Sequence, residues 1–382
     1  MELRILWLLP LALLFSYLSS GYTMSRDTMK LEVVQALFRH GERAPQRYEY
    51  NILNYLNVSA YEPFGLEHLT NTGKMQAFKV GQMLRERYKN FLNDKYSSED
   101  VYARSSENPR TRMTLQLVLA GLFPPTKELR WNPKLDWMPI AYSYSPTELD
   151  ALLKSQLTKK FYKLYDDLFE TSYGIETLAS NKDIFDLLDK HNYKVSTTTV
   201  TDLAAVHNIL LIHERLHLPL PDWYTDNIKQ RFAEIFELYH DTQSYTKEMK
   251  RLNGGPIIKT FINNMNLNKT TKDPKKLYLY SGHDLNVGAV IRALNARDFH
   301  NSDFCSTLIL EKLRDSRNQV YVKLLHWDAI KEEMETVRIG DCDEICPIDK
   351  FLEHTRDVIP TEEELFSMYD EYDINYVKKF FV

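Results

Sequence analysis

The stretch KLEVVQALFRHGERAP, residues 30–45, decides how the rest of the chain is interpreted. Residues 30–38 form a short apolar run with β-branched valines, which predicts a buried strand. The run ends in a polar segment where Arg39 and Arg43 flank His40, and where Gly and Pro break the strand. Guanidinium groups bind phosphate oxygens through paired hydrogen bonds, and an imidazole can act as a nucleophile. This segment therefore suggests a phosphoryl group held by arginines near His40, although an ordinary surface loop also fits one short motif.

Two later segments place polar residues directly after a predicted strand. Residues 277–280 lead into Ser281-Gly282-His283-Asp284, and residues 101–103 lead into Arg104. In open α/β sheets, ligands bind beyond the carboxyl ends of the strands, so we expect the three segments to meet in one pocket. A strand followed by a helix, repeated along the chain, predicts an α/β fold with a mainly parallel sheet and helices on both faces.

The pattern of apolar residues changes along the chain and divides it into three parts after the N-terminal segment. Residues 136–250 have helical periodicity without a convincing strand, so we interpret them as an α-helical cap inserted into an α/β core. The core is predicted to comprise residues 28–135 and 251–350, with a β-hairpin within 306–325. Residues 351–382 are predicted to be a tail that packs on the core.

The N-terminus has the layout of a secretory signal peptide, predicted over residues 1–21. Arg4 precedes an apolar run, 5–18, and small residues follow up to a cleavage site near Gly21. A membrane anchor would need a longer run without the interruption at Pro10. No later stretch is long and apolar enough to span a bilayer, so we expect export and no membrane span.

The composition is that of an ordinary soluble globular protein, with 382 residues, 43% of them hydrophobic and 26% charged. The formal net charge of −5 gives no basic excess, so we expect no nucleic-acid partner. A phosphate site must then be a local basic pocket on a mildly acidic protein. Two sequons, at Asn57 and Asn268, are available for glycosylation on the secretory route.

Three cysteines leave two interpretations open. Cys342 and Cys346 could close a local disulfide in an oxidising compartment. They could also form half of a zinc site, but no second pair of thiols accompanies them. Cys305 is left over, and we expect it to be buried and free.

The three polar segments together resemble a known family. Arg39-His40-Gly41-Glu42-Arg43-Ala44-Pro45 resembles the signature of the histidine acid phosphatases, and residues 281–284 resemble their second, His-Asp motif. Residues 104–106 resemble the middle arginine segment of the family, and 69–76 and 84–88 also fit. The resemblance covers nearly the whole mature chain and is greatest to insect venom-type secreted acid phosphatases. It implies a histidine phosphatase fold, similar to phosphoglycerate mutase, and a local cysteine pair.

The resemblance also implies a role for each matching residue. His40 would attack phosphorus and form a phosphohistidine, and Asp284 would protonate the leaving alkoxide and later activate water. Glu42 has no implied chemistry, and we expect it to orient Arg43 or to face solvent. The residues expected to bind the phosphoryl oxygens are Arg39, Arg43, Arg104 and His283.

The implied function is a secreted acid phosphatase that hydrolyses orthophosphoric monoesters at acidic pH without a metal or another cofactor. Small phosphomonoesters are the expected substrates. Phosphoprotein substrates, a homodimer, a lysosomal location and a venom role are left open. Within the family, a phytase-like specificity is a further alternative, although phytases usually carry more disulfides than three cysteines allow.

Two alternatives lie outside this function. His213-Glu214-Arg215-Leu216-His217 fits the H-E-x-x-H pattern of zinc proteases, with the two histidines on one helical face. Pro219 follows directly, and apolar neighbours favour an ordinary helix end instead. The other alternative is a catalytically silent binding protein on the same fold, which should have lost one of the site residues; none is lost.

Overall fold

The structure, a computed structural model, describes residues 29–366 except 54, 270–272, 298 and 300–302. The predicted signal peptide and residues 367–382 of the predicted tail lie outside the described residues. The strands, α-helices and 3-10 helices (η) follow one another as β1 (Lys30–Arg39), α1 (Arg47–Ile52), η1 (Val58–Tyr61), α2 (Asn71–Arg87), β2 (Val101–Ser105), α3 (Pro109–Leu122), η2 (Thr147–Leu149), η3 (Ser155–Leu157), α4 (Lys159–Leu168), α5 (Ser172–Ser180), α6 (Lys182–Lys190), α7 (Thr201–Arg215), α8 (Asp226–Thr242), α9 (Lys247–Asn253), α10 (Gly255–Asn264), β3 (Leu277–Gly282), α11 (Asp284–Ala293), β4 (Thr307–Arg314), β5 (Val320–Asp328), β6 (Glu333–Val337), β7 (Cys346–Pro347), α12 (Ile348–Thr355), η4 (Arg356–Val358) and α13 (Glu362–Phe366).

The central sheet is mixed, with strand order β2-β3-β1-β4-β5-β6 and with β7 paired to β5. Strands β2, β3 and β1 run parallel, as the alternation of strands and helices predicts. Strands β4, β5 and β6 add to β1 in antiparallel pairs. The β4–β5 pair is the predicted hairpin, and Asn318 lies in its turn with a φ of 68°. The α/β fold class is thus confirmed. The polar segments identified in the sequence all belong to or follow the parallel strands β1, β2 and β3.

The register of the parallel strands aligns their carboxyl ends. Arg39 pairs with Gly282 across β1 and β3, and Ser105 pairs with Ser281 across β2 and β3. The chain therefore leaves all three strands at one edge of the sheet. His40 follows β1 directly, and its backbone N–H donates to the carbonyl of Gly282 at 3.1 Å.

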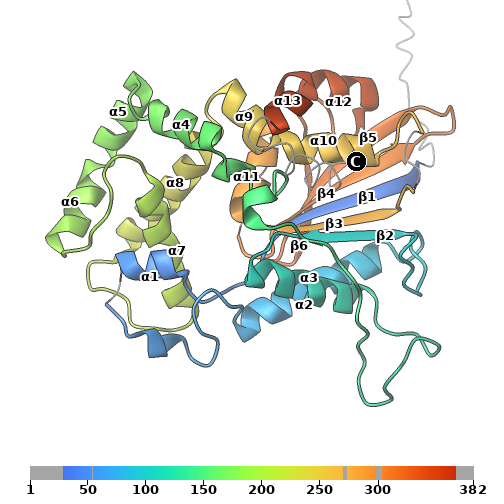
Figure 1. Cartoon of the computed structure of the whole chain (residues 1–382), viewed down its shortest axis with the longest axis horizontal. Helices are drawn as coiled ribbons and strands as arrows, with labels where there is room; N and C mark the ends of the chain where they lie inside the picture. The colour runs from blue at the N-terminus through green and yellow to red at the C-terminus, as the bar shows by residue number, and fades with distance from the viewer. Residues whose placement is uncertain (1–28, 54, 270–272, 298, 300–302, 367–382) are drawn as a thin grey trace, which may run out of the picture.

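Helices cover both faces of the sheet, as predicted (Figure 1). On one face, α2 and α3 pack against inward residues of the strands such as Phe38 and Leu279. On the other face, α10, α11 and α12 pack against residues such as Leu37 and Tyr280. Adjacent residues Leu37 and Phe38 thus enter opposite cores, because successive side chains of a strand point to opposite faces.

The α2–α3 pair depends on a close backbone approach. A Cβ atom on Gly81 would lie 2.1 Å from the carbonyl oxygen of Val118, and one on Gly121 would lie 2.3 Å from that of Phe78. Any larger residue would push the two helices apart. Thr70 caps the N-terminus of α2, and its hydroxyl accepts a hydrogen bond from the N–H of Gly73.

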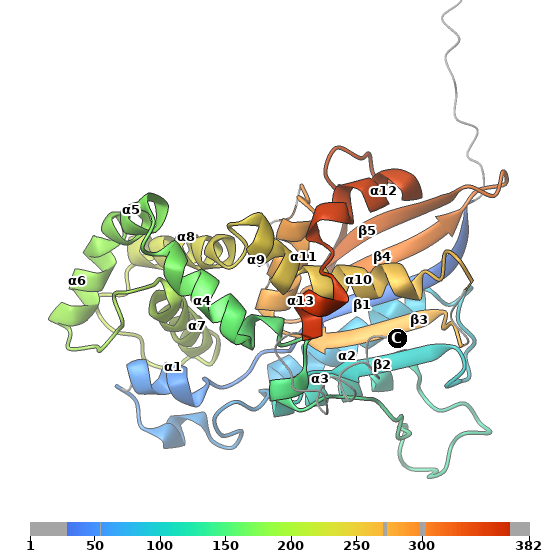
Figure 2. The same ribbon diagram turned by 45° about the horizontal axis from the view of Figure 1, so that its top comes forward.

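The segment between β2 and β3 contains the predicted helical region. Helices α4 to α8 lie beside the sheet rather than on its faces (Figures 1 and 2). Ile209 on α7 and Phe232 on α8 belong to a separate apolar cluster. Ile52 and Leu53 from the end of α1 join this cluster, so part of the chain before residue 136 also packs on the helical region. The domain boundaries remain a prediction.

The remaining sequence features have clear positions. Cys342 and Cys346 form a disulfide with an S–S distance of 2.04 Å, and Cys305 is buried and free. Asn57 and Asn268 are exposed, while Thr270 of the second sequon lies outside the described residues. Phe351 of α12 belongs to the core cluster of the sheet. Among the described residues, no helix has both the length and the apolar character needed to cross a membrane.

Candidate active site

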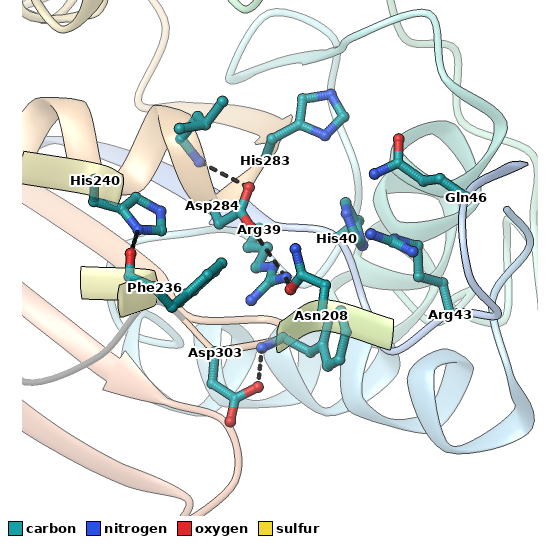
Figure 3. A network of polar contacts seen from close by, with 12 residues as sticks. Arg39, His40, Arg43, Gln46, Asn208, Phe236, His240, His283, Asp284 and Asp303 are labelled. Carbon is teal, nitrogen blue, oxygen red and sulfur yellow. Dashed lines mark hydrogen bonds and ion pairs between the residues drawn. The ribbon is translucent and has the colours of Figure 1, made fainter. Parts of the chain in front are cut away.

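A cavity of about 170 Å³ lies where the carboxyl ends of β1 and β3 meet the helical region. Residues after both strands contribute to its wall, and so do side chains from α1, α3 and α7. Figure 3 shows some of the side chains that line it, such as His40, Asn208 and His283, which come from segments far apart in the sequence. The charged and imidazole side chains that line the cavity are His40, Arg43, Glu49, Arg110, Lys154, His283 and Asp284.

The imidazole of His40 is fixed in one tautomer. Its Nδ1 lies 2.9 Å from the carbonyl oxygen of Gly41, which can only accept, so Nδ1 carries the proton. The other nitrogen, Nε2, then carries the lone pair that a nucleophile needs. Burial, followed by the charges of Arg110 and Arg43, holds the pKa of His40 well below its ordinary value. This environment favours the neutral, nucleophilic form of the ring.

Arg43 is held by a carboxylate that sequence inspection did not identify. Both terminal nitrogens of Arg43 donate to Glu49, at 2.7 and 2.8 Å, and both side chains are buried. Glu49 also accepts from the backbone N–H of Gln46 at the start of α1. The expectation that Glu42 orients Arg43 or faces solvent is wrong. Glu42 is buried and accepts from the hydroxyl of Thr70 instead.

Arg39 and Asp284 form an ion pair beside the cavity, with Nη2 of Arg39 3.1 Å from Oδ2 of Asp284 (Figure 3). The same Nη2 lies 3.5 Å from the amide oxygen of Asn208, and the guanidinium lies over the ring of Phe304. Asp284 begins α11 and accepts from the backbone N–H of Leu285. Burial raises the pKa of Asp284, but Arg39, His240 and this hydrogen bond together hold it below its ordinary value.

His283 lies next to His40, with ring centroids 5.6 Å apart and nearly perpendicular planes. Its Nε2 shares a hydrogen bond of 3.0 Å with the hydroxyl of Ser106, which orients the ring. Burial and the nearby cations Lys154 and Arg110 hold the pKa of His283 well below its ordinary value. Five of the predicted site residues therefore meet at this edge of the sheet: Arg39, His40, Arg43, His283 and Asp284.

The structure contradicts the prediction that Arg104 binds the phosphoryl group. Its Nη2 donates to the buried carboxylate of Asp150 at 2.6 Å and to the hydroxyl of Ser145 at 3.1 Å. Arg104 is not among the residues that line the cavity. Strand β2 continues to Ser105, so Arg104 lies within the strand rather than at its end.

Arg110, rather than Arg104, is the arginine near the end of β2 that lines the cavity. It lies in the first turn of α3, lines the cavity and is buried. One nitrogen donates to the side chain of Gln46, while Nε and Nη1 have no hydrogen-bond partner among the described residues. Burial and Arg43 lower the pKa of Arg110 to about 10, so it stays charged in acid. Pro109, a frequent residue at the first position of a helix, was the available signal for this helix start.

The H-E-x-x-H segment does not form a zinc site, so that alternative is wrong. His213 is buried, and its two ring nitrogens lie 2.6 and 2.7 Å from the hydroxyls of Tyr55 and Tyr61. Helix α7 ends at Arg215, and His217 is exposed with a φ of 53°. The two histidines therefore do not share a helical face, and the nitrogens of His213 are already engaged.

A histidine flanked by buried arginines at the carboxyl edge of an α/β sheet points to the class of phosphatases with an active-site histidine. The chain belongs to the histidine phosphatase superfamily (branch 2), whose family model matches residues 30–326. Venom acid phosphatase Acph-1 of Apis mellifera is 35% identical over 88% of this chain and 87% of its own length. Lysosomal acid phosphatase of Homo sapiens is 29% identical over 87% of this chain and 79% of its own length.

Solved structures share the fold. The phytase from Citrobacter braakii matches with a TM-score of 0.66 over 87% of this chain and 98% of that chain, at 18% identity. The Hafnia alvei phytase in complex with tartrate matches with a TM-score of 0.66 at 17% identity, over 87% of this chain and 98% of that chain. At such low identity, the two structures show the histidine phosphatase fold alone.

Proposed function

We propose that this chain is a secreted acid phosphatase that hydrolyses small phosphomonoesters through a phosphohistidine at His40. The observation that carries the proposal is the state of His40, whose Nδ1–H is engaged by Gly41 and whose Nε2 is left as a nucleophile in a cavity rich in arginine. The site is complete, which favours an enzyme over a silent binding protein.

The first step transfers the phosphoryl group from the ester to the enzyme. Nε2 of His40 forms a bond to phosphorus, and the bond between phosphorus and the ester oxygen breaks. Asp284, in its protonated form, gives its proton to the departing alkoxide. In the second step, Asp284 takes a proton from water while the water oxygen bonds to phosphorus and the bond between phosphorus and Nε2 of His40 breaks. Inorganic phosphate leaves, and His40 and protonated Asp284 are restored.

Arg43 and Arg110 donate hydrogen bonds to the nonbridging oxygens of the phosphoryl group, and His283 adds a further donor. Arg39 joins them when Asp284 is protonated, because its carboxylate partner is then neutral. The need for a protonated Asp284 links the activity to acid, and the lowered pKa of His40 favours its neutral form there. Carboxylate clusters that could hold a catalytic metal are not part of this mechanism, so we propose that no cofactor is needed.

Export is supported by the signal-peptide pattern of residues 1–21 and by the disulfide between Cys342 and Cys346, which suits an oxidising compartment. The relatives named above include a venom protein and a lysosomal protein, so both destinations remain compatible with the proposal. Glycosylation at Asn57 and Asn268, phosphoprotein substrates, a phytase-like specificity and a homodimer remain predictions.

The test is a phosphate-release assay on p-nitrophenyl phosphate with the wild type and two variants. His40→Ala should abolish turnover. His217→Asn, which changes an exposed histidine and keeps a residue that tolerates a positive φ, should retain it. Quenching without acid, followed by mass spectrometry, should find the phosphoryl adduct on His40. Turnover by His40→Ala near the wild-type rate would overturn the mechanism.

A further inference from the structure

Lys154 is a cation of the cavity that the proposed mechanism does not use. It lies in the turn before η3 and lines the cavity together with Arg110, His283 and Asp284. Its ammonium group forms no hydrogen bond or ion pair with any residue that the structure describes, which sets it apart from Arg43 in the same wall. Lys154 is half-buried, and a partly desolvated positive charge without a protein partner favours an anionic ligand.

The carboxylates around Lys154 are already engaged. Asp150 of the same turn pairs with Arg104, and Asp284 of α11 pairs with Arg39. Glu107, which precedes α3, accepts from the backbone N–H and the hydroxyl of Thr147. None of these three carboxylates forms an ion pair with Lys154 in the described part of the chain, although Oδ2 of Asp150 makes no hydrogen bond there.

The charge of the cavity exceeds what one phosphoryl group requires. Arg43 and Arg110 both line the cavity, and Arg43 pairs with Glu49. The proposed mechanism already assigns Arg39, Arg43, Arg110 and His283 to the transferred phosphoryl group. Lys154 adds one more charge, which the transferred group does not need.

A second group beside Lys154 suits a polar leaving alcohol. Gln156 lines the same cavity and is only 7% exposed. Its amide oxygen has no hydrogen-bond partner among the described residues and could accept from a substrate hydroxyl. Arg110, with two unpartnered nitrogens, lines the same cavity.

We propose that Lys154 is a specificity-determining residue that selects phosphomonoesters whose leaving alcohol carries a second anionic group close to the ester oxygen. The inference rests on the proposed phosphatase function and adds a substrate class to it. A leaving group of about three carbon atoms with a carboxylate is the simplest member of this class.

The selection should depend on pH. Burial and Arg110 lower the pKa of Lys154 to about 7, while Asp150, Asp284 and Glu107 act in the opposite direction. Lys154 is thus charged in the acidic range and loses its charge as the pH rises through 7. The carboxylate of the substrate is ionised throughout this range. The preference for an anionic leaving group should therefore be strong in acid and weak in base.

The experiment compares two substrates that differ in one group, glycerol 3-phosphate and 3-phosphoglycerate. The ratio compared is kcat/KM for 3-phosphoglycerate divided by kcat/KM for glycerol 3-phosphate. At pH 5, this ratio should fall by about 10-fold or more in Lys154→Met, as expected for the loss of one charge-assisted hydrogen bond. Lys154→Arg should keep most of the wild-type ratio. Between pH 5 and 9 the ratio should fall in the wild type but not in Lys154→Arg, because arginine stays charged.

An unchanged ratio in Lys154→Met would overturn the proposal. Equal losses on both substrates would also overturn it, because Lys154 would then bind the transferred phosphoryl group. Binding to His40→Ala protein separates this failure from failure of the proposed function. There, the added Lys154→Met change should weaken the binding of 3-phosphoglycerate about 10-fold more than that of glycerol 3-phosphate. If the protein hydrolyses neither ester but still shows this difference in binding, only the proposed phosphatase function would be refuted.

Discussion

Arg104 and Arg110 are both buried arginines near the end of β2, yet their surroundings give them different tasks. Arg104 is neutralised by Asp150, a carboxylate with no exposed surface. Arg110 lines the cavity and has no carboxylate partner among the residues that the structure describes. A guanidinium without a protein counter-ion attracts a ligand anion, whereas a paired one stabilises the fold.

Substitution of the two arginines should therefore separate activity from stability. Arg110→Gln should lower kcat/KM for a phosphomonoester by about 10²-fold or more, since a charged donor to the phosphoryl group is lost, while thermal stability changes little. Arg104→Met should leave the buried Asp150 without its partner and destabilise the protein by roughly 3–5 kcal/mol. Thermal melts and phosphate-release kinetics on both variants provide the measurement. A stable but inactive Arg104→Met protein would return Arg104 to the site.

Asp284 is predicted to act as an acid for the leaving group. Asp284→Asn keeps the shape of the side chain but loses the exchangeable proton. Formation of the phosphohistidine from glycerol phosphate should then slow by roughly 10²–10⁴, the usual contribution of general acid catalysis. The burst with p-nitrophenyl phosphate should slow much less, because this leaving oxygen carries negative charge well. Rapid-quench kinetics with both esters measure the two rates. Equal losses would mean that Asp284 binds or orients the substrate.

At the scale of the helices and strands, a close backbone contact joins α2 and α3. In an exposed helix, Gly→Ala stabilises by about 1 kcal/mol. At Gly81 the added methyl would meet the backbone oxygen of Val118, so Gly81→Ala should destabilise by roughly 1–3 kcal/mol instead. Gly65→Ala is the control, because Gly65 has a φ of +75° but no atom within 4 Å of the added Cβ. Urea denaturation should show the larger loss at Gly81, and the opposite order would refute the contact.

The strands and the site residues that follow them were predictable because each depends on local sequence. The apolar run of β1 ends at Arg39, so the position of His40 follows from the strand itself. Arg110 was missed because its role depends on where β2 ends and α3 begins, and element boundaries are the least certain part of sequence interpretation. Glu49 was missed because its contact with Arg43 requires α1 to turn back over the site, which no periodicity reveals.

At the scale of the whole molecule, the site lies between two separately packed parts. The sheet with its covering helices supplies His40, His283 and Asp284, and helix α7 of the helical region supplies Asn208. The apolar cluster of that region is distinct from those of the sheet. The chemistry therefore depends on the sheet, while the space for the leaving group depends on how the helical region closes over it.

An enzyme that works in acid must also stay folded there, and Glu32 connects the two halves of the sheet in a way that serves this need. On β1, its carboxylate accepts from Arg314 at 2.5 and 3.0 Å and lies 3.0 Å from Lys312, both on β4. The hydrogen bond from Arg314, opposed by partial burial and aided by Lys312, lowers the pKa of Glu32 from 4.5 to about 2.

Because this pKa is lower in the folded protein, the stabilisation is complete above about pH 4.5 and is lost as the pH falls towards 2. Glu32→Gln should therefore reduce the free energy of unfolding by roughly 1–3 kcal/mol at pH 6, after allowance for partial exposure, and by almost nothing at pH 2. Denaturant unfolding between pH 2 and 6 measures the difference. Glu332→Gln, which removes an exposed partner of Lys79, is the control and should cost less than about 1 kcal/mol at pH 6. A constant deficit for Glu32→Gln across this range would mean that the glutamate acts through packing rather than through its charge.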